Sequence, residues 1–159
     1  MLTINVICIG KLKEKFFKDA VDEYSKRLSR YCKLEITELS DEKIPNNPSE
    51  KQMQEVKEKE CSNIISHIKS DSYIISLDLT GKQLTSEELS EKLDNLSLST
   101  SHITFIIGGS LGLTDSVLSK SDSILSFSKM TFPHQLIRIF LLEQVYRAFK
   151  ISAGETYHK

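Results

Sequence analysis

Five short apolar runs alternate along this chain with five stretches in which apolar residues recur every three or four positions. Short apolar runs are typical of buried β-strands, and the periodic stretches are typical of amphipathic helices. Regular alternation of the two predicts an α/β fold, with a mostly parallel sheet and helices on both of its faces. The expected strands are residues 2–9, 34–39, 73–79, 103–107 and 124–127, and the expected helices begin near residues 16, 49, 85, 114 and 133.

Three of the expected helices carry specific start signals. Ser49 is followed three residues later by Gln52, and Thr85 is followed in the same way by Glu88. Both pairs have the spacing of a capping box, in which two side chains satisfy free backbone N–H groups. Pro133 suits the first position of the last helix, because proline has no N–H to leave unpaired there.

The length and composition predict one domain covering residues 1–159. The chain has no internal repeat or low-complexity linker, and its length suffices for one substantial core. Its apolar runs are shorter than the roughly 18 residues that suggest a membrane span, and residues 1–9 lack the basic start of a signal peptide. Because Cys8, Cys32 and Cys61 have no CxxC spacing, we expect reduced thiols, no metal site and a cytoplasmic protein with no membrane partner.

The net charge of −1 hides an uneven distribution of charge along the chain. Residues 1–34 carry eight Lys or Arg against four Asp or Glu, and residues 129–159 carry five against two. Residues 35–128 carry eight basic side chains against sixteen acidic ones. Because local charge attracts a polyanion, the two basic ends would bind one if they meet in space. The alternative is that these lysines only solvate helix faces.

The last expected helix, residues 133–151, is apolar on nearly every side. Such a helix must be buried on more than one side. The sheet covers one side, and we expect a second subunit to cover the other in a homodimer. The alternative is a helix sunk in the core of its own chain.

The glycine-rich loop GGSLG at 108–112 directly follows the fourth expected strand. Ligands of open α/β sheets bind at the carboxyl ends of the strands, so this loop is a candidate cofactor site. A dinucleotide fingerprint would place GxGxxG in the first strand-to-helix turn, and a Walker loop would have the pattern GxxxxGK. The chain has neither. Taken alone, the loop is either a ligand contact or a tight turn.

Further polar candidates lie near the same expected edge of the sheet. Asp78, at the end of the third strand, suits an acid, a ribose partner or a helix cap. His134 and Arg138 share one face of the last helix, although a single histidine on a helix is more often structural than catalytic. The tail at 154–159 either frays or folds over a neighbouring site.

Three segments together resemble the cofactor loops of the SPOUT methyltransferases. They are LDLTGK at 77–82, FIIGGSLG at 105–112 and LSFSKMTFPHQ at 125–135. The helix from Arg138 to Arg147 and the ending Tyr157-His158-Lys159 are similar to the RlmH type, whose members methylate N3 of a pseudouridine in the large ribosomal RNA. The resemblance extends over essentially the whole chain, including IGKLK at 9–13.

This resemblance implies that the C-terminal part of the chain, within about residues 75–159, passes through a trefoil knot. Close passage of backbones in a knot would explain the small residues Gly108, Gly109, Ser126 and Ser128. The resemblance also implies S-adenosyl-L-methionine as the cofactor. It would bind in a bent conformation, with backbone groups of the loops contacting its adenine. The implied cofactor contacts are Leu77, Gly108, Gly109, Phe127, Ser128, Lys129, Met130, Thr131 and Phe132.

The implied reaction moves a methyl group from a sulfonium to a ring nitrogen, whose proton must leave. His134 and His158 are the candidate proton acceptors, and Glu143 ranks below them because its helix is mostly apolar. Arg138 and Arg147 suit an RNA phosphate or the developing negative oxygen, since guanidinium groups fit both.

The implied partner is ribosomal RNA, in an assembled ribosome or subunit rather than a free hairpin. Tyr157 suits stacking on the target base once that base leaves its helix. In a homodimer, the basic start of one chain would flank the tail of the other and bind RNA backbone through Lys11, Lys13, Lys15 and Lys18. Two alternatives stay open: a SPOUT methyltransferase acting at a different RNA position, and a non-catalytic α/β dimer that binds RNA.

Overall fold

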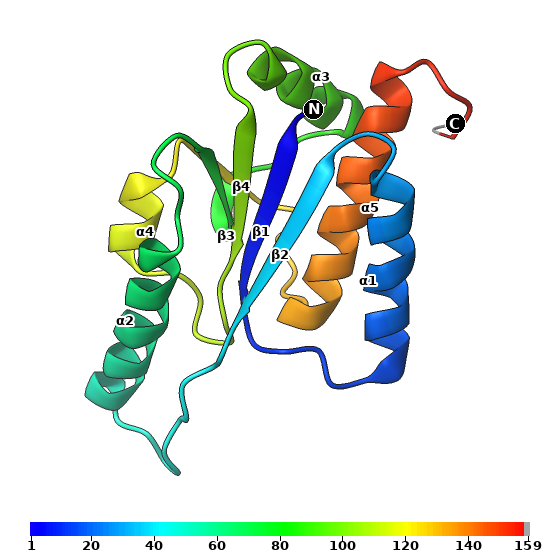
Figure 1. The fold of residues 1–159 in the computed structure, drawn as a ribbon. Coiled ribbons are helices and arrows are strands. Elements are labelled where there is room, and N and C mark those ends of the chain that lie inside the picture. The colour runs from blue at the N-terminus through cyan, green and yellow to red at the C-terminus, as the bar shows by residue number, and fades with distance from the viewer. Residues whose placement is uncertain (158–159) are drawn as a thin grey trace.

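Neighbouring strands of the sheet are all parallel, which confirms the predicted α/β fold (Figure 1). The structure is a computed structural model that describes residues 1–157. The strands are β1 (Thr3–Ile9), β2 (Lys33–Leu39), β3 (Tyr73–Lys82), β4 (His102–Ile107) and β5 (Ser123–Leu125), in the spatial order β2-β1-β4-β3-β5. The helices are α1 (Lys15–Leu28), α2 (Glu50–Ser66), α3 (Ser86–Ser97), α4 (Asp115–Lys120) and α5 (His134–Ser152).

The starts of α2 and α3 follow the sequence signals. Ser49 and Thr85 cap these helices, and both capping boxes are formed in full. The Ser49 hydroxyl accepts from the backbone N–H of Gln52 at 3.1 Å, and the Thr85 hydroxyl accepts from that of Glu88 at 3.1 Å. Pro133 is the N-cap of α5 rather than its first helical residue, one position away from the prediction.

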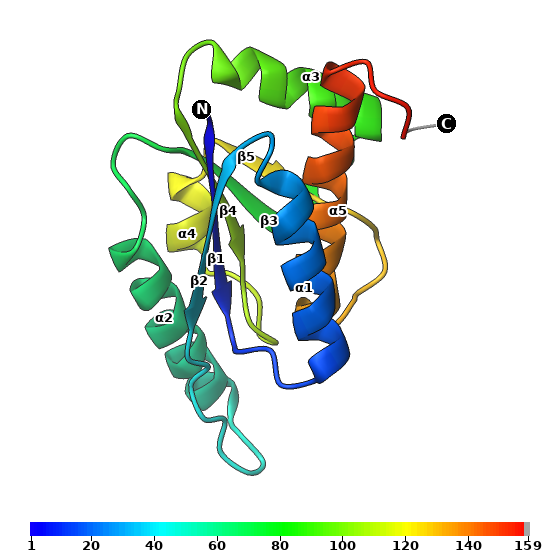
Figure 2. The same ribbon diagram turned by 45° about the vertical axis from the view of Figure 1, so that its right-hand side comes forward.

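The helices form two layers, one on each face of the sheet (Figures 1 and 2). The layer of α1, α3 and α5 packs on a core that includes Val6 and Phe105. The layer of α2 and α4 packs on Ile7, Ile9 and Ile106, which lie in the carboxyl halves of β1 and β4. This second layer therefore brings α2 close to the end of the sheet where ligands of parallel sheets bind.

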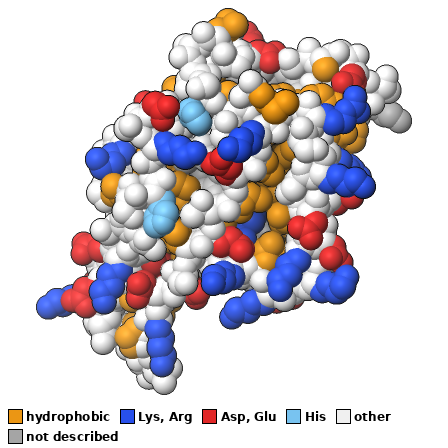
Figure 3. Space-filling model, viewed as in Figure 1, with side chains coloured by type: hydrophobic (Ala, Val, Ile, Leu, Met, Phe, Trp, Pro, Cys, Tyr) orange, Lys and Arg blue, Asp and Glu red, His pale blue; other side chains and the backbone are white. Residues whose placement is uncertain are grey.

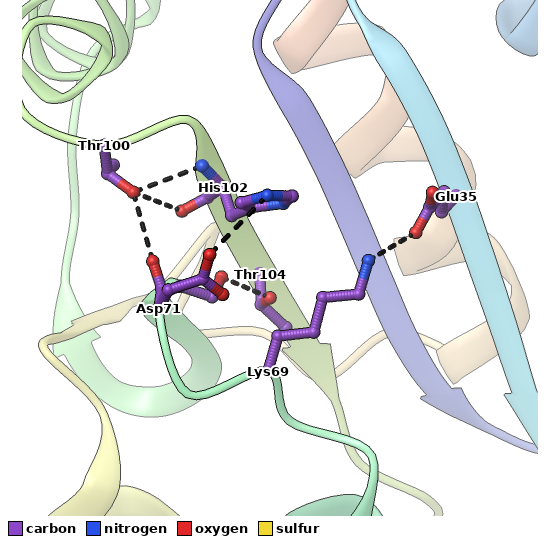
Figure 4. A network of polar contacts seen from close by, with 7 residues as sticks. Glu35, Lys69, Asp71, Thr100, His102 and Thr104 are labelled. Carbon is purple, nitrogen blue, oxygen red and sulfur yellow. Dashed lines mark hydrogen bonds and ion pairs between the residues drawn. The ribbon is translucent and has the colours of Figure 1, made fainter.

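The amino-terminal end of the same face is polar (Figure 4). Lys69 donates to Glu35 of β2 at 2.9 Å, and Asp71 lies 3.7 Å from Nε2 of His102 on β4. The Thr100 hydroxyl accepts from the backbone N–H of His102 at 3.1 Å. These contacts join the loop between α2 and β3 to the sheet, so this end is held by side chains of the same chain.

Helix α5 is buried largely by its own chain. It packs against α1 and α3 as well as against the sheet, and Leu141, Leu142 and Val145 are fully buried. The core of its own chain therefore buries most of the apolar surface of α5. This is the alternative to a helix at a subunit interface. Phe140 stays 37% exposed and Met130 74% exposed. The homodimer stays a prediction, and these side chains are the apolar surface that a second subunit would cover.

Two backbones pass closely at Gly81, near the end of β3. A Cβ built on Gly81 would lie 2.6 Å from the carbonyl carbon of Leu125 and 2.7 Å from that of Ile124. Because β5 passes so closely, the Ser126 N–H also donates to the carbonyl of Lys82 at 3.0 Å. The predicted knot requires close passage of this kind. The sequence argument located it at other small residues, and Gly81 was missed.

Candidate active site

Residues 77–80 of β3 and the loops that follow β4 and β5 meet at the carboxyl end of the sheet around one cavity of about 510 Å³. These three segments are the ones predicted to hold the cofactor. The start of α5 and one side chain of α2 complete the lining. The lining residues are Lys57, residues 77–80, 107–113, 125–128 and 130–132, His134 and Ile137.

Eight of the nine predicted cofactor contacts line this cavity, and Lys129 does not. Lys129 is exposed to solvent in the loop after β5. The cavity also includes Asp78, whose carboxylate accepts hydrogen bonds from the backbone N–H and the hydroxyl of Thr80. The carboxylate of Asp78 thus makes a local contact within β3 and caps no helix, since the next helix begins at Ser86 with Thr85 as its cap.

Close packing behind the glycine loop explains its first two glycines. A Cβ built on Gly108 would lie 2.9 Å from Cδ2 of Leu113, and one built on Gly109 would lie 3.0 Å from Oε1 of Glu60. The N–H of Gly112, which has a φ of +81°, donates to the carbonyl of Gly109 at 3.0 Å and closes the turn. The loop is therefore both a tight turn and a cavity wall, with its backbone close to any ligand.

The loop after β5 is held in shape by its own serines. The Ser126 hydroxyl donates to the carbonyl of Ser128 at 3.0 Å, and the Ser128 hydroxyl accepts from the N–H of Met130 at 3.0 Å. Phe132 packs edge-on against Phe140 of α5, with 5.5 Å between the ring centroids. These contacts within the chain hold the loop in one shape, and a preorganised loop loses little conformational freedom when it binds a ligand.

The cavity fits an adenosine-containing cofactor. Its walls combine apolar side chains with the backbone of two tight loops, which suits a flat base read by backbone N–H and C=O groups. Added Cβ atoms would collide behind Gly108 and Gly109, so glycine at these positions lets the loop pack closely on the residues behind it.

His134 begins α5 at the edge of this cavity. Gly10, at the end of β1, has a φ of +92°, and a Cβ built there would lie 3.0 Å from Nε2 of His134. Burial lowers the pKa of His134, and the charge of Arg138 lowers it further, while Asp41 opposes them. The imidazole is therefore neutral near pH 7, the form that can accept a proton.

Arg138 lies one turn beyond His134 but is fully buried, with 0% of its surface exposed. Its Nη1 donates to Oε2 of Glu38 at 2.6 Å, and its Nη2 donates to the carbonyl of Gly10 at 3.0 Å. The same Glu38 oxygen accepts from the N–H of Leu12 at 3.1 Å. The structure thus gives Arg138 a positioning role for the loop after β1, in place of the predicted direct contact with an RNA phosphate or an oxyanion.

Tyr157 packs on α5 of its own chain and does not line the cavity. Its hydroxyl donates to Glu143 at 2.9 Å, and its ring centroid lies 4.6 Å from the guanidinium of Arg147. Arg147 also donates to Glu143 at 2.9 Å. Because Glu143 is six residues beyond Ile137, this cluster is about 9 Å further along the helix axis than the cavity wall. His158, the other predicted tail candidate, lies outside the described residues.

The comparisons with known proteins agree with this geometry. A family model described as "Predicted SPOUT methyltransferase" matches residues 2–158. The chain belongs to the SPOUT methyltransferases. SPOUT methyltransferases of the RlmH type, which this chain resembles, use S-adenosylmethionine as the methyl donor, and the cavity described above is the place that fits it.

Individual relatives of this SPOUT methyltransferase cover its whole length. Proteins named "Ribosomal RNA large subunit methyltransferase H" from Clostridium novyi (strain NT) and Clostridium botulinum (strain Kyoto / Type A2) are 60% and 59% identical, over 99% of this chain and 100% of theirs. A solved structure of a probable methylase family protein from Haemophilus influenzae Rd KW20 covers 98% of this chain and 70% of its own, with a TM-score of 0.53. At 14% identity, it supports the fold alone.

Some residues of the site were missed by sequence reasoning. Helix α2 supplies Lys57 to the cavity and Glu60 and Cys61 to the back of the glycine loop. The thin apolar stripe of α2 predicts a helix that covers one face or an edge of the sheet, and it gives no signal of which loop the charged residues meet. Within residues 1–157, no helix is long and apolar enough to cross a membrane, and no group of three His, Cys, Asp or Glu could hold a metal ion.

Proposed function

We propose that this chain transfers a methyl group from S-adenosylmethionine to N3 of a pseudouridine in 23S ribosomal RNA, on the assembled ribosome. We further propose that residues 1–159 form one domain that acts as a cytoplasmic homodimer. The observation that carries the proposal is the meeting of three segments, all predicted from the sequence as cofactor contacts, around one cavity beside His134. The names of relatives about 60% identical over the full length support the choice of substrate.

The cofactor supplies an electrophilic methyl group, so the protein must mainly orient the two reactants and exclude water. The glycine loop and the loop after β5 provide a preformed binding surface. The N3 proton of the target base leaves as the methyl group arrives, and a neutral His134 at the cavity edge is the acceptor among the described residues. Gly10 and Arg138 fix the position of that imidazole.

The basic start of the chain supports RNA binding close to this cavity. Lys11, Lys13, Lys15 and Lys18 are all exposed. Figure 3 shows Lys and Arg side chains gathered at the lower right, over α1 and the loop before it. This is the carboxyl end of the parallel strands, the end that carries the cavity (Figure 1). RNA backbone held there would bring a target base towards the cofactor.

A second subunit has a defined place in this proposal. Met130, Phe132 and Phe140 form an apolar surface at the cavity, and covering it in a homodimer would exclude water from the reaction. Tyr157 packs on α5 of its own chain and does not line the cavity of that chain. The tail of each subunit is therefore proposed to reach the RNA at the cavity of the other subunit.

The test is mass spectrometry of 23S ribosomal RNA from cells with and without this protein. We expect one methyl group to disappear from one pseudouridine and to return when the protein is restored. Loss of a methyl group elsewhere would favour a SPOUT methyltransferase with a different RNA position. Unchanged RNA, together with no thermal stabilisation by S-adenosylhomocysteine, would favour a non-catalytic RNA-binding dimer; a ligand at about 100 times its Kd should stabilise by roughly 2.7 kcal/mol.

A further inference from the structure

Helix α2 packs against the back of the cofactor loop through two adjacent residues, Glu60 and Cys61. Thr114 donates its N–H to Sγ of Cys61 at 3.3 Å, and Sγ of Cys61 lies 4.0 Å from the carbonyl of Gly112. Glu60, only 5% exposed, places Oε1 3.0 Å from the Cβ position of Gly109. These contacts fix the rotation of α2 about its axis relative to the loop.

The same face of α2 directs Lys57 to the cavity. Lys57 precedes Glu60 by three residues and Cys61 by four, so all three share one side of the helix. Lys57 is half-buried and lines the cavity together with the glycine loop. Within residues 1–157, no carboxylate pairs with its ammonium group.

The charges around the cavity make this lysine distinctive. It is the only Lys or Arg among the described lining residues, and Asp78 is the only Asp or Glu. Asp78 already accepts two hydrogen bonds from Thr80. With no carboxylate partner among the described residues, the ammonium group of Lys57 is free to donate to an anionic oxygen of a ligand, and hydrogen bonds between charged groups are among the stronger ones.

We propose that Lys57 binds the carboxylate of the amino-acid arm of the cofactor. This inference rests on the proposed function, because it takes the cavity to be the cofactor site. The carboxylate is the only anion of S-adenosylmethionine, and Lys57 is the only permanent cation that the described part of the chain offers to this cavity. Lys57 is thus a specificity-determining residue, since it distinguishes ligands that carry the amino-acid arm from those that lack it.

The test compares two ligands that differ in this arm. S-adenosylhomocysteine carries the carboxylate, and 5′-methylthioadenosine keeps the adenosine and the thioether but lacks the arm. Binding of both is measured by isothermal titration calorimetry to the wild-type chain, to Lys57→Ala and Lys57→Arg, and to the control Lys59→Ala. Lys59 lies on the same helix and is exposed, and it does not line the cavity.

We expect Lys57→Ala to weaken S-adenosylhomocysteine roughly ten- to a hundredfold, the usual range for one hydrogen bond to a charged group, and to leave 5′-methylthioadenosine unchanged. Lys57→Arg should keep part of the affinity, and Lys59→Ala all of it. An equal loss for both ligands would overturn the inference, because Lys57 would then only shape the wall.

Unchanged binding of both ligands to Lys57→Ala would also overturn the inference. If the same variant showed a raised KM for ribosomes, its ammonium would instead be assigned to an RNA phosphate. A wild-type chain that binds neither ligand would overturn the proposed function itself, and the inference with it. The two failures are therefore distinguishable.

Discussion

Replacing Arg138 by methionine tests whether this arginine positions the site or acts on the substrate. The guanidinium is fully buried between Glu38 and the carbonyl of Gly10, at 2.6 and 3.0 Å. Methionine keeps an unbranched apolar stem but removes the charge and both of these hydrogen bonds. The Gly10 carbonyl then loses a buried donor, while the Glu38 side chain, 36% exposed, can recover water.

The two contacts set the expected loss of stability. Hydrogen bonds to charged groups contribute about 1.5–3 kcal/mol each. Hydration of Glu38 offsets part of the loss on that side, so the free energy of unfolding should fall by about 3 kcal/mol in total. For a chain of this size, each kcal/mol corresponds to roughly 2–4 °C, which predicts a Tm about 6–12 °C lower.

Urea unfolding followed by circular dichroism measures this loss, with Arg27→Met as the matched control. Arg27 is half-buried, pairs with Glu23 one turn away at 3.0 Å and lies 5.5 Å from the ring centroid of Tyr24, and because both contacts are open to solvent, its loss should cost only about 1 kcal/mol. A double-mutant cycle with Glu38→Gln should show that the two residues are coupled. Wild-type stability of Arg138→Met with abolished methylation would refute the reasoning, because Arg138 would then act directly on substrate.

Three further predictions concern the chain crossing, the tail and the basic start. Gly81→Ala should lower the free energy of unfolding by more than about 1 kcal/mol in urea, because its Cβ would lie 2.6–2.8 Å from backbone atoms of Ile124 and Leu125; wild-type stability would show that the crossing can open. Removing Tyr157, His158 and Lys159 should abolish methylation but leave S-adenosylhomocysteine binding intact, since Tyr157 does not line the cavity; full activity would exclude the tail from the reaction. RNA binding should weaken steeply with salt, and replacing Lys11 or Lys13 by alanine should each reduce the slope by about 1, whereas Lys120→Ala on α4 should not.

Much of the fold could be predicted because local patterns and tertiary packing agree. The capping boxes at Ser49 and Thr85 mark real helix starts, since the atoms involved are three residues apart. Strands β1 and β4 were found because their apolar runs are buried on both faces, whereas the half-buried β2 was found from its alternation of apolar and polar residues. The ends of β3 and β5 were less accurate: β3 continues to Lys82 and β5 stops at Leu125, where the two backbones pass each other at Gly81.

The parts of the site that sequence reasoning missed depend on distant contacts. Helical spacing correctly placed Arg138 near His134, but the partners that bury it are 100 and 128 positions away in the chain. Lys57 and Glu60 belong to a highly charged helix whose thin apolar stripe predicts only that it covers one face or an edge of the sheet. Only the packing of α2 against the glycine loop gives these two side chains a role, and periodicity does not say which loop a helix will meet.

Arg138 affects the protonation of His134 as well as its position, and a purely structural role would not change the pH dependence of the reaction. Arg138 holds the carbonyl of Gly10, and Nε2 of His134 packs against Gly10. Burial first, and then the charge of Arg138, lower the pKa of His134 below its ordinary value of 6.5. Because only the neutral imidazole accepts a proton, methylation should fall as the pH drops through this lowered pKa.

Removing the charge in Arg138→Met should therefore raise the pKa of His134 and move the acid limb of the rate profile to higher pH. His134→Gln should lower the rate and remove that limb. The measurement is the initial rate of methylation from pH 5.5 to 8.5, at temperatures where circular dichroism shows each variant folded. If the acid limb lies at the same pH in wild type and in Arg138→Met, His134 is not the titrating group. Removing the charge of Arg138, which lowers the pKa of His134, must change the proton affinity of this half-buried imidazole.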